Sequence, residues 1–390
     1  MKQLLFLSFF IILLFSCGKN DDDKCTDEPL STGQKIWATQ LDDFYSFDRC
    51  KWIDMGKSLV LINDFSAFES IVFLIDKETG EIKNSSLLDF SYYSKVYVYN
   101  DEFIYKNPIS DIIIYNPYTK TSKTVETGLN LEGFSVTGNK IIYAGYPYVD
   151  TLDVIAMVDI NTMQTDVIFK NKYNSNDDNI NKFRDPFLYV SQENDSLIYF
   201  VTHKNNVSSQ SKLNIYNLET KELRTKENNS FYLYEMFTEK NNLFYLSEDR
   251  FMKLNPQNLN VVWETRFSKY LTLYKATSIF MPNNILLFNK HEAIFIDRKT
   301  GKVHWKEESF NYFKGMDNYI ESEKAIFLND KLYLKYETGE VKFLDVNSGE
   351  YSQYYCNSPE ILNSISNWYD NENNLYYISY DKKVVKYKQE

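Results

Sequence analysis

The chain has 390 residues, of which 43% are hydrophobic and 17% aromatic, and its formal net charge is −11 at pH 7. These proportions are typical of a globular protein that buries a large core, and the many aromatic residues favour β-strands. The net negative charge, and the lack of a basic stripe of Lys and Arg, exclude nucleic acid as a partner. Contacts of Lys and Arg with phosphate supply most of the affinity of proteins for nucleic acid.

The N-terminal residues combine one positive charge, an apolar run and a cysteine. Lys2 precedes the run LLFLSFFIILLF, which is too short for a permanent membrane span. The run leads into LFSC, ending at Cys17, and this order resembles the lipobox of bacterial lipoproteins. The resemblance implies that residues 1–16 are a signal peptide and that Cys17 carries acyl chains such as palmitate, which anchor the protein to a membrane.

Residues 17–30 are polar and charged, and they predict a flexible tether in front of a single folded domain, residues 31–390. Three aspartates, Asp21 to Asp23, lie directly behind the lipidated cysteine. They resemble the export signal that some Gram-negative bacteria use for surface lipoproteins. We therefore expect a lipid-anchored protein of the bacterial outer membrane, and the sequence leaves periplasmic and cell-surface exposure both open.

One local pattern recurs along the rest of the chain: an apolar strand, an Asp or Asn, a short polar turn and a second strand. The clearest copy is IFIDRKTGKVHW, residues 294–305. An Asp or Asn side chain at the start of a turn can accept hydrogen bonds from backbone groups ahead of it. We therefore predict hairpin turns at seven anchors: Asp76, Asn116, Asp159, Asn217, Asn255, Asp297 and Asp345.

The fourth position after each anchor is expected to be left-handed, a conformation that glycine adopts without steric cost. Three turns have glycine there, namely Gly80, Gly301 and Gly349. The other four have Lys120, Met163, Lys221 and Leu259. Trp263 and Trp305 lie on the strands that follow their turns, and we expect them to cover the neighbouring repeat.

The anchors are 38 to 58 residues apart. A step of about 45 residues has room for four short strands, the size of one β-propeller blade. The Asp-x-x-Thr-Gly-x-x-x-Trp form at Asp297 to Trp305 resembles the quinoprotein-type, or PQQ-like, repeat. This repeat is known from propellers that bind pyrroloquinoline quinone and from many that do not. The resemblance implies an all-β propeller.

The two chain ends are complementary. Residues 30–41, LSTGQKIWATQL, contain Thr-Gly and Trp37 but follow no strand, whereas the C-terminal segment stops where a turn and an outer strand should come. We predict that the N-terminal strand completes the C-terminal blade and covers its open edge. With seven anchors, this predicts an eight-bladed propeller, and seven blades is the alternative.

The widest step, between Asp159 and Asn217, contains two polar segments, residues 171–186 and 203–212. Neither shows apolar periodicity, so both are predicted to be loops inserted on the ring.

No catalytic motif is present. His203, His291 and His304 lack the spacing of a zinc site, and no phosphate loop or nucleophile elbow occurs. Because His304 and Trp305 are neighbours on a strand, we expect their side chains to face opposite sides. The alcohol dehydrogenases that these repeats resemble have two adjacent cysteines beside the cofactor. This chain has no pair of adjacent cysteines. We therefore predict no catalytic residue, no cofactor and no metal.

Three cysteines remain beside the lipidated one. An exported protein meets an oxidising compartment, where one disulfide can form among three thiols. The sequence permits Cys50–Cys356 or Cys25–Cys50 and does not choose between them.

A lipid-anchored chain of this length with such repeats resembles the propeller lipoprotein of the outer-membrane barrel-assembly machine, a scaffold for partner proteins. The resemblance implies a non-catalytic scaffold that binds envelope proteins. The alternative is a surface propeller that binds a ligand such as a glycan, and a quinoprotein dehydrogenase is a third class. Exposed Tyr or Trp around the central channel would favour the glycan, and an apolar patch on the rim would favour the scaffold.

Overall fold

The computed structural model describes the middle and C-terminal parts of the chain with short gaps. The described residues are 33–42, 50–64, 66, 68–90, 95–147, 152–172, 181–190, 196–204, 211–228, 233–239, 242–247, 250–266, 277–288, 293–307, 325–328, 331–335, 341–355, 367–369, 374–379 and 381–389. The predicted signal peptide and tether, with Cys17 and Cys25, lie outside these residues, as do His291 and Cys356.

Within these ranges all regular elements are β-strands, which form eight four-stranded antiparallel sheets. None of the described residues belongs to a helix long and apolar enough to cross a membrane. The first four sheets comprise β2 (Cys50–Met55), β3 (Ser58–Asp64), β4 (Ser70–Asp76) and β5 (Ile82–Leu88); β6 (Val96–Tyr99), β7 (Glu102–Lys106), β8 (Ile112–Asn116) and β9 (Thr121–Val125); β10 (Asn130–Thr137), β11 (Lys140–Tyr146), β12 (Leu152–Asp159) and β13 (Thr165–Lys172); and β14 (Asn181–Val190), β15 (Leu197–Lys204), β16 (Ser211–Asn217) and β17 (Leu223–Asn228).

The next three sheets repeat this arrangement. They comprise β18 (Leu233–Glu239), β19 (Asn242–Ser247), β20 (Arg250–Leu254) and β21 (Val261–Arg266); β22 (Thr277–Phe280), β23 (Asn284–Phe288), β24 (Ala293–Asp297) and β25 (Val303–Glu307); and β26 (Ala325–Leu328), β27 (Lys331–Lys335), β28 (Val341–Asp345) and β29 (Tyr351–Tyr355). The last sheet differs, because β30 (Asn367–Tyr369), β31 (Asn374–Ile378) and β32 (Lys383–Gln389) are joined by β1 (Gly33–Gln40) from the other end of the chain.

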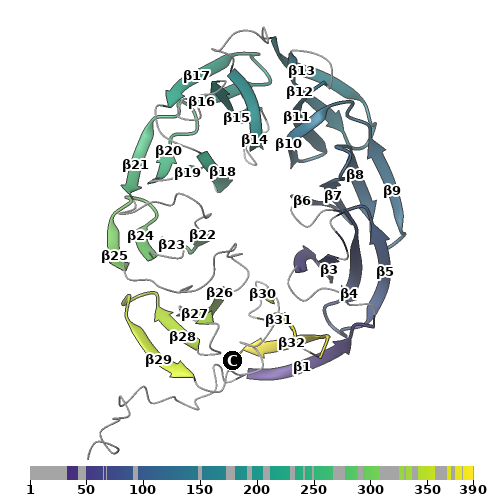
Figure 1. Ribbon diagram of the computed structural model, residues 1–390, viewed down its shortest axis with the longest axis vertical. Coiled ribbons are helices and arrows are strands. Elements are labelled where there is room, and N and C mark those ends of the chain that lie inside the picture. The colour runs from purple at the N-terminus through teal and green to yellow at the C-terminus, as the bar shows by residue number, and fades with distance from the viewer. Residues whose placement is uncertain are drawn as a thin grey trace, which may run out of the picture.

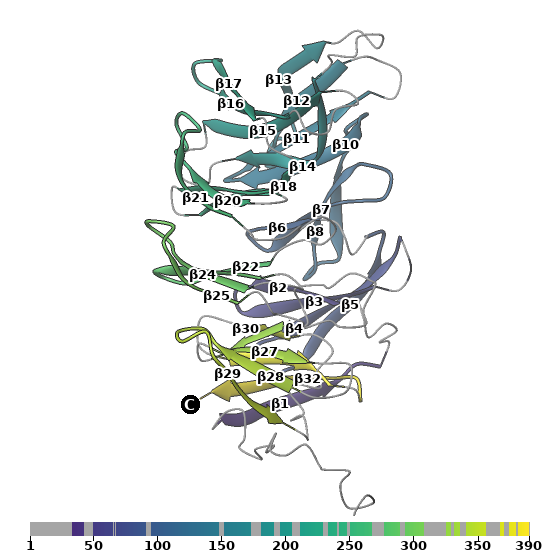
Figure 2. The same cartoon turned by 60° about the vertical axis from the view of Figure 1, so that its left-hand side comes forward.

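The sheets follow one another around a ring in chain order, and Figure 1 shows their fourth strands on the outside. Figure 2, turned by 60°, shows the same sheets stacked one above another, and apolar clusters join both faces of the β10–β13 sheet to its neighbours. The middle strands of a sheet therefore have neighbours on both faces. This explains why β24 and β31 are apolar and buried almost throughout, whereas the outer strand β5 alternates between half-buried and exposed residues.

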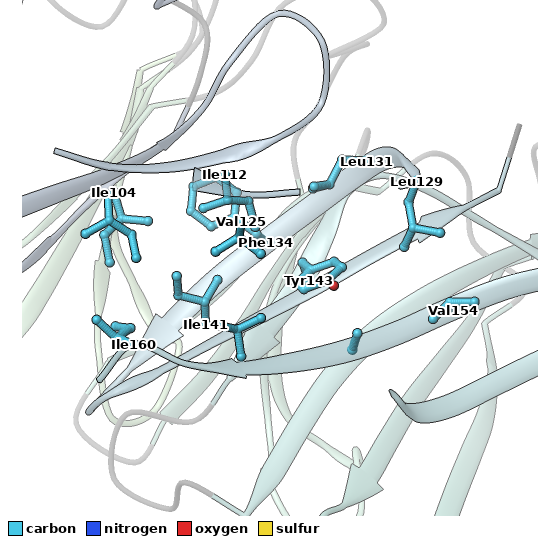
Figure 3. Packing of buried hydrophobic residues seen from close by; sticks show 13 residues of the cluster. Ile104, Ile112, Val125, Leu129, Leu131, Phe134, Ile141, Tyr143, Val154 and Ile160 are labelled. Atoms are coloured by element: carbon cyan, nitrogen blue, oxygen red, sulfur yellow. The ribbon is translucent and has the colours of Figure 1, made fainter. Parts of the chain in front are cut away.

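The hydrophobic core lies between neighbouring sheets. Figure 3 shows the cluster between the β6–β9 and β10–β13 sheets, where Ile104 and Ile112 face Phe134 and Ile141. All four side chains are almost completely buried. Similar clusters join four other pairs of adjacent sheets, which therefore stabilise one another along the ring.

The first and last parts of the chain share one such cluster. Leu41, which follows β1, packs with Leu61 and Phe73 of the β2–β5 sheet and with Ile378 of β31. Within the last sheet, β1 pairs antiparallel with β32 from Gly33 opposite Gln389 to Gln40 opposite Lys383. The N-terminal strand is thus built into the C-terminal sheet.

The two polar segments between Asp159 and Asn217 are only partly loops, so that prediction was wrong at their ends. Residues 171–172 belong to β13 and residues 181–186 to β14, and residues 203–204 and 211–212 belong to β15 and β16. Backbone pairing with β15 decides the conformation of β14, although its sequence lacks alternation. The register of this pair shifts between Phe183 and Leu188, around Pro186, which cannot donate to a ladder.

Candidate functional site

The seven anchor residues lie in turns of one design. Each joins the third and fourth strands of its sheet, and the anchor Oδ1 accepts a hydrogen bond from the backbone N–H two residues ahead. At Asp297 the distances are 3.0 Å to Lys299 N and 2.7 Å to Thr300 N, and the Thr300 hydroxyl donates to the same oxygen at 2.7 Å. The carboxylate is therefore occupied in holding the turn.

The fourth residue after every anchor has a left-handed backbone. The φ angles are 76° at Gly80, 73° at Gly301 and 76° at Gly349. Lys120, Met163, Lys221 and Leu259 have φ of 59°, 58°, 59° and 59°. A side chain in this conformation costs about 1–2 kcal/mol, so four of the turns carry local strain that the three glycine turns avoid.

The three glycine turns are those covered by a tryptophan from the preceding sheet. Trp37 covers Gly80, Trp263 covers Gly301 and Trp305 covers Gly349, and an added Cβ would lie 2.5 Å, 2.6 Å and 2.8 Å from the respective indole rings. Glycine is thus needed at these turns both for its backbone conformation and for the space that the ring occupies.

Each indole N–H donates to the carbonyl of the residue after the anchor. The distances are 3.2 Å to Lys77 O, 3.2 Å to Arg298 O and 2.7 Å to Val346 O. Asn84 makes the equivalent contact, since its Nδ2 donates to Pro117 O at 2.7 Å. We call Trp37, Asn84, Trp263 and Trp305 the docking residues.

A β-bulge directs each docking residue toward its target. The register shifts immediately before Trp37, Asn84, Trp263 and Trp305 in their outer strands. A bulge changes the direction in which the following side chain points. At the last of these bulges the rings of both His304 and Trp305 lie against Phe295, with centroids 5.4 Å and 5.7 Å away, so the expected placement on opposite sides was wrong.

The same contacts hold β1 to the first complete sheet. Trp37 docks on the turn at Asp76, and the Thr39 hydroxyl donates to Gly80 O at 2.6 Å. Lys386 of β32 also donates to Lys77 O, at 3.0 Å. The N-terminal strand is therefore fixed on both sides, by pairing with β32 and by docking on the next sheet.

The carboxylates of Asp76, Asp159 and Asp297 are stabilised in their ionised form. The pKa of Asp297 is lowered by the hydrogen bond from the Thr300 hydroxyl and then by that from the Thr300 backbone. For Asp159 the backbone N–H of Thr162 lowers the pKa most. For Asp76 the main cause of a lowered pKa is Lys83, which forms an ion pair with it. These shifts have structural causes and create no proton donor near neutral pH.

The described residues contain no group of three or more His, Cys, Asp or Glu side chains placed to hold a metal ion. His304 Nε2 lies 3.1 Å from Asn284 Oδ1. Cys50 is the first residue of β2, and its buried Sγ accepts a hydrogen bond from Asn63 Nδ2 at 3.4 Å. Because Cys25 and Cys356 lie outside the described residues, the disulfide pairing stays a prediction.

Two exposed apolar side chains stand at the end of the ring opposite the anchor turns. Phe68 is 63% exposed in the β3–β4 connection, and Ile109 is 73% exposed in the β7–β8 connection. Both connections join the second and third strands of successive sheets, which places them at the same end of the ring. Neither side chain is among the predicted site residues, although the sequence places Ile109 between Pro108 and Ser110, which are typical turn residues.

The turn around Ile109 is held by hydrogen bonds. Asn107 Oδ1 accepts from Asp111 N at 2.8 Å, and the Thr127 hydroxyl donates to Ser110 O at 2.9 Å. Ser110 has φ of 74°, a left-handed conformation that these bonds maintain. The isoleucine is therefore presented on an ordered turn, which lowers the entropic cost of contacting a partner.

Comparison with known structures shows the fold. BamB from Moraxella catarrhalis has 11% sequence identity and a TM-score of 0.54, with coverage of 92% of this chain and 98% of its own. The computationally designed Ika8 protein has 11% identity, a TM-score of 0.56 and coverage of 92% and 100%. A europium-containing methanol dehydrogenase has 10% identity, a TM-score of 0.55 and coverage of 92% and 86%.

No protein-family model and no curated protein matches the chain. The structural likenesses, together with the repeated turns, identify the fold as that of a PQQ-like β-propeller.

Gly301→Ala should lower the free energy of unfolding by about 2–4 kcal/mol, because it adds left-handed strain and a clash with the Trp263 ring. Lys221→Gly is the matched control at an equivalent position without such a ring, and it should be neutral or stabilising by up to about 1 kcal/mol. Urea unfolding followed by tryptophan fluorescence measures both. Equal destabilisation by the two variants would contradict the docking role of Gly301.

Asp297→Asn should reduce the acid sensitivity of the protein. The folded-state pKa of Asp297 lies below its ordinary value of 3.8, so its stabilising contribution is present above that pH and is lost as pH falls through the lower folded value. Asparagine keeps the turn, as Asn116 shows, but does not titrate. Unfolding midpoints measured between pH 7 and 2 should fall less steeply in Asp297→Asn, whereas the reverse change Asn116→Asp should steepen them.

Proposed function

We propose that the chain is an outer-membrane lipoprotein whose eight-bladed propeller binds partner proteins and has no catalytic activity. The observation that carries the proposal is the pair of exposed apolar side chains, Phe68 and Ile109, on one end of a rigid ring. Exposed apolar patches mark interaction sites, and these two side chains are the most exposed of the large hydrophobic residues described. The exposed large hydrophobic residues among those described are mostly aliphatic and include no tryptophan and one tyrosine, Tyr118, which lies in an anchor turn, and this favours a protein partner over a glycan.

Two observations support eight blades in a closed ring. The described strands form eight four-stranded sheets, and β1 supplies the outer strand of the sheet that also contains β30, β31 and β32. Trp37 on β1 then docks on the first complete sheet as Trp263 and Trp305 do elsewhere. The N-terminal strand therefore closes the ring in this proposal, and no sheet face is left without a neighbouring blade.

The position of β1 supports a particular orientation at the membrane. Gly33, the first residue of β1, pairs with Gln389 at the end of β32. Since β32 is the third strand of its sheet, this position lies at the same end of the ring as the anchor turns of the other sheets. A tether from Cys17 would join the ring at that end and span at most roughly 50 Å. Phe68 and Ile109, at the opposite end, would then face away from the bilayer and be accessible to partners.

The structural likeness to BamB, a propeller lipoprotein of the barrel-assembly machine, supports a protein-binding scaffold in general. The likeness to a methanol dehydrogenase is to an enzyme of the same fold. The absence of an adjacent cysteine pair from the sequence favours the non-enzymatic role.

Native protein purified from detergent-solubilised envelopes should recover envelope proteins in stoichiometric amounts, and Ile109→Glu with Phe68→Glu should reduce this recovery at least fivefold. Val167→Glu, at an exposed position on the outer strand β13, is the matched control and should leave recovery unchanged. Cys17→Ala should abolish incorporation of a palmitate analogue and weaken recovery. Recovery of the propeller alone, with binding on a glycan array, would contradict the scaffold and support the alternative ligand-binding role.

A further inference from the structure

The outer strands of the eight sheets differ in how their free edges are shaped. The register shifts within six of them, namely β1, β5, β13, β21, β25 and β29. The other two, β9 and β17, pair with their inner neighbours without any shift. A bulge disrupts the regular spacing of backbone groups along an edge strand and so hinders pairing with another chain. Because β9 and β17 have no bulge, they retain the regular edges that an added strand requires.

Neither regular strand carries a docking residue. The equivalent positions, eight residues after the anchors Asn116 and Asn217, are Thr124 and Thr225. Thr124 is exposed. The bulge and the docking residue therefore occur together in β1, β5, β21 and β25, and an outer strand that makes no such docking contact can stay straight.

The two regular strands differ in their side-chain contacts with the next sheet. In β17, Arg224 and Lys226 donate to Gln257 O and Leu259 O of the next sheet. In β9, residues 121–124 are all exposed, and Figure 1 shows this strand on the outside of the ring. Thr and Val, which dominate β9, also have high β-propensity.

The charges beside β9 favour an acidic partner segment. Lys120 and Lys123 are both exposed. Lys120 Nζ donates to Ser85 O at 3.1 Å, and the Lys123 side chain is 52% exposed with its Nζ 3.6 Å from Glu102. An ion pair at this distance that is exposed to solvent is weak. Lys123 can therefore form a closer ion pair with a carboxylate of a partner instead. A second copy of β9 would not fit, because antiparallel self-pairing would place Lys123 opposite its own copy.

We propose that β9 is a strand-addition site, at which an extended acidic segment of a partner protein pairs with the outer edge of the β6–β9 sheet. Backbone hydrogen bonds to β9 supply the affinity, and a carboxylate opposite Lys123 supplies the preference for acidic sequence. This inference rests on the proposed scaffold function, for which it names the chemistry of one partner.

The test uses the lipidated protein in detergent and a fluorescein-labelled peptide that alternates Thr or Val with Glu. Fluorescence anisotropy should show saturable binding, at least tenfold tighter than for the same peptide with Lys in place of Glu. N-methylation of alternate peptide amides should abolish binding, because it removes the backbone donors that strand addition uses. Absence of saturable binding, or binding indifferent to N-methylation, would overturn the proposal.

Two variants locate the site. Lys123→Glu should weaken binding of the acidic peptide at least fivefold, whereas Lys170→Glu makes the same charge change on the bulged strand β13 and should have no effect. Equal effects of the two variants would indicate general charge attraction and overturn the site. If Lys123→Glu protein recovers the same envelope proteins as the unchanged protein, strand addition at β9 is contradicted but the scaffold function is not. If the peptide binds but no envelope protein is recovered, only the scaffold function is contradicted.

Discussion

The structure depends on one constraint: the middle strands of every sheet are apolar on both faces, so each sheet needs a neighbour on each side. Ile141 of β11 and Ile155 of β12, in the same sheet, illustrate this, because the first packs toward the β6–β9 sheet and the second toward the β14–β17 sheet. A sheet of this kind cannot be stable alone, and a row of them would leave an apolar face at each end. Arrangement around a ring supplies neighbours for the terminal sheets, and the cluster that joins Leu41 and Ile378 to Leu61 lies where they meet.

Packing between sheets is non-directional, and the docking contacts give it a fixed geometry. A tryptophan over a glycine turn combines apolar contact with a hydrogen bond to one specified carbonyl, so it permits one position of the next sheet. Where the tryptophan is missing, other side chains reach the same carbonyls: Asn84 donates to Pro117 O, and the Tyr199 hydroxyl donates to Pro256 O at 3.0 Å. The carbonyl is thus the common element of these contacts, while the donor varies.

This geometry also explains why the repeat motif is a poor guide to activity. The Asp, Thr, Gly and Trp of the most complete repeat are all engaged in one turn and its contacts with neighbouring sheets, which leaves none of them for a ligand. The recognition that we propose is therefore placed on parts that the repeat does not specify. These are the connections that carry Phe68 and Ile109 and the regular edge of β9.

The sequence by itself determined the features that depend on a few neighbouring residues: the strands flanking each anchor, the Asp or Asn turns, the left-handed fourth position and the PQQ-like propeller fold. It could not show the bulges, the role of Asn84, the strand character of residues 181–186 or the exposure of Ile109. Each of these is decided by atoms distant in the chain. The indole N–H groups of Trp37, Trp263 and Trp305 reach carbonyls 40, 35 and 41 residues away, and β14 is a strand because β15 offers it a partner. Local chemistry specifies a turn within a few residues, whereas the direction of a side chain and the shape of an edge are settled only when the neighbouring sheet is in place.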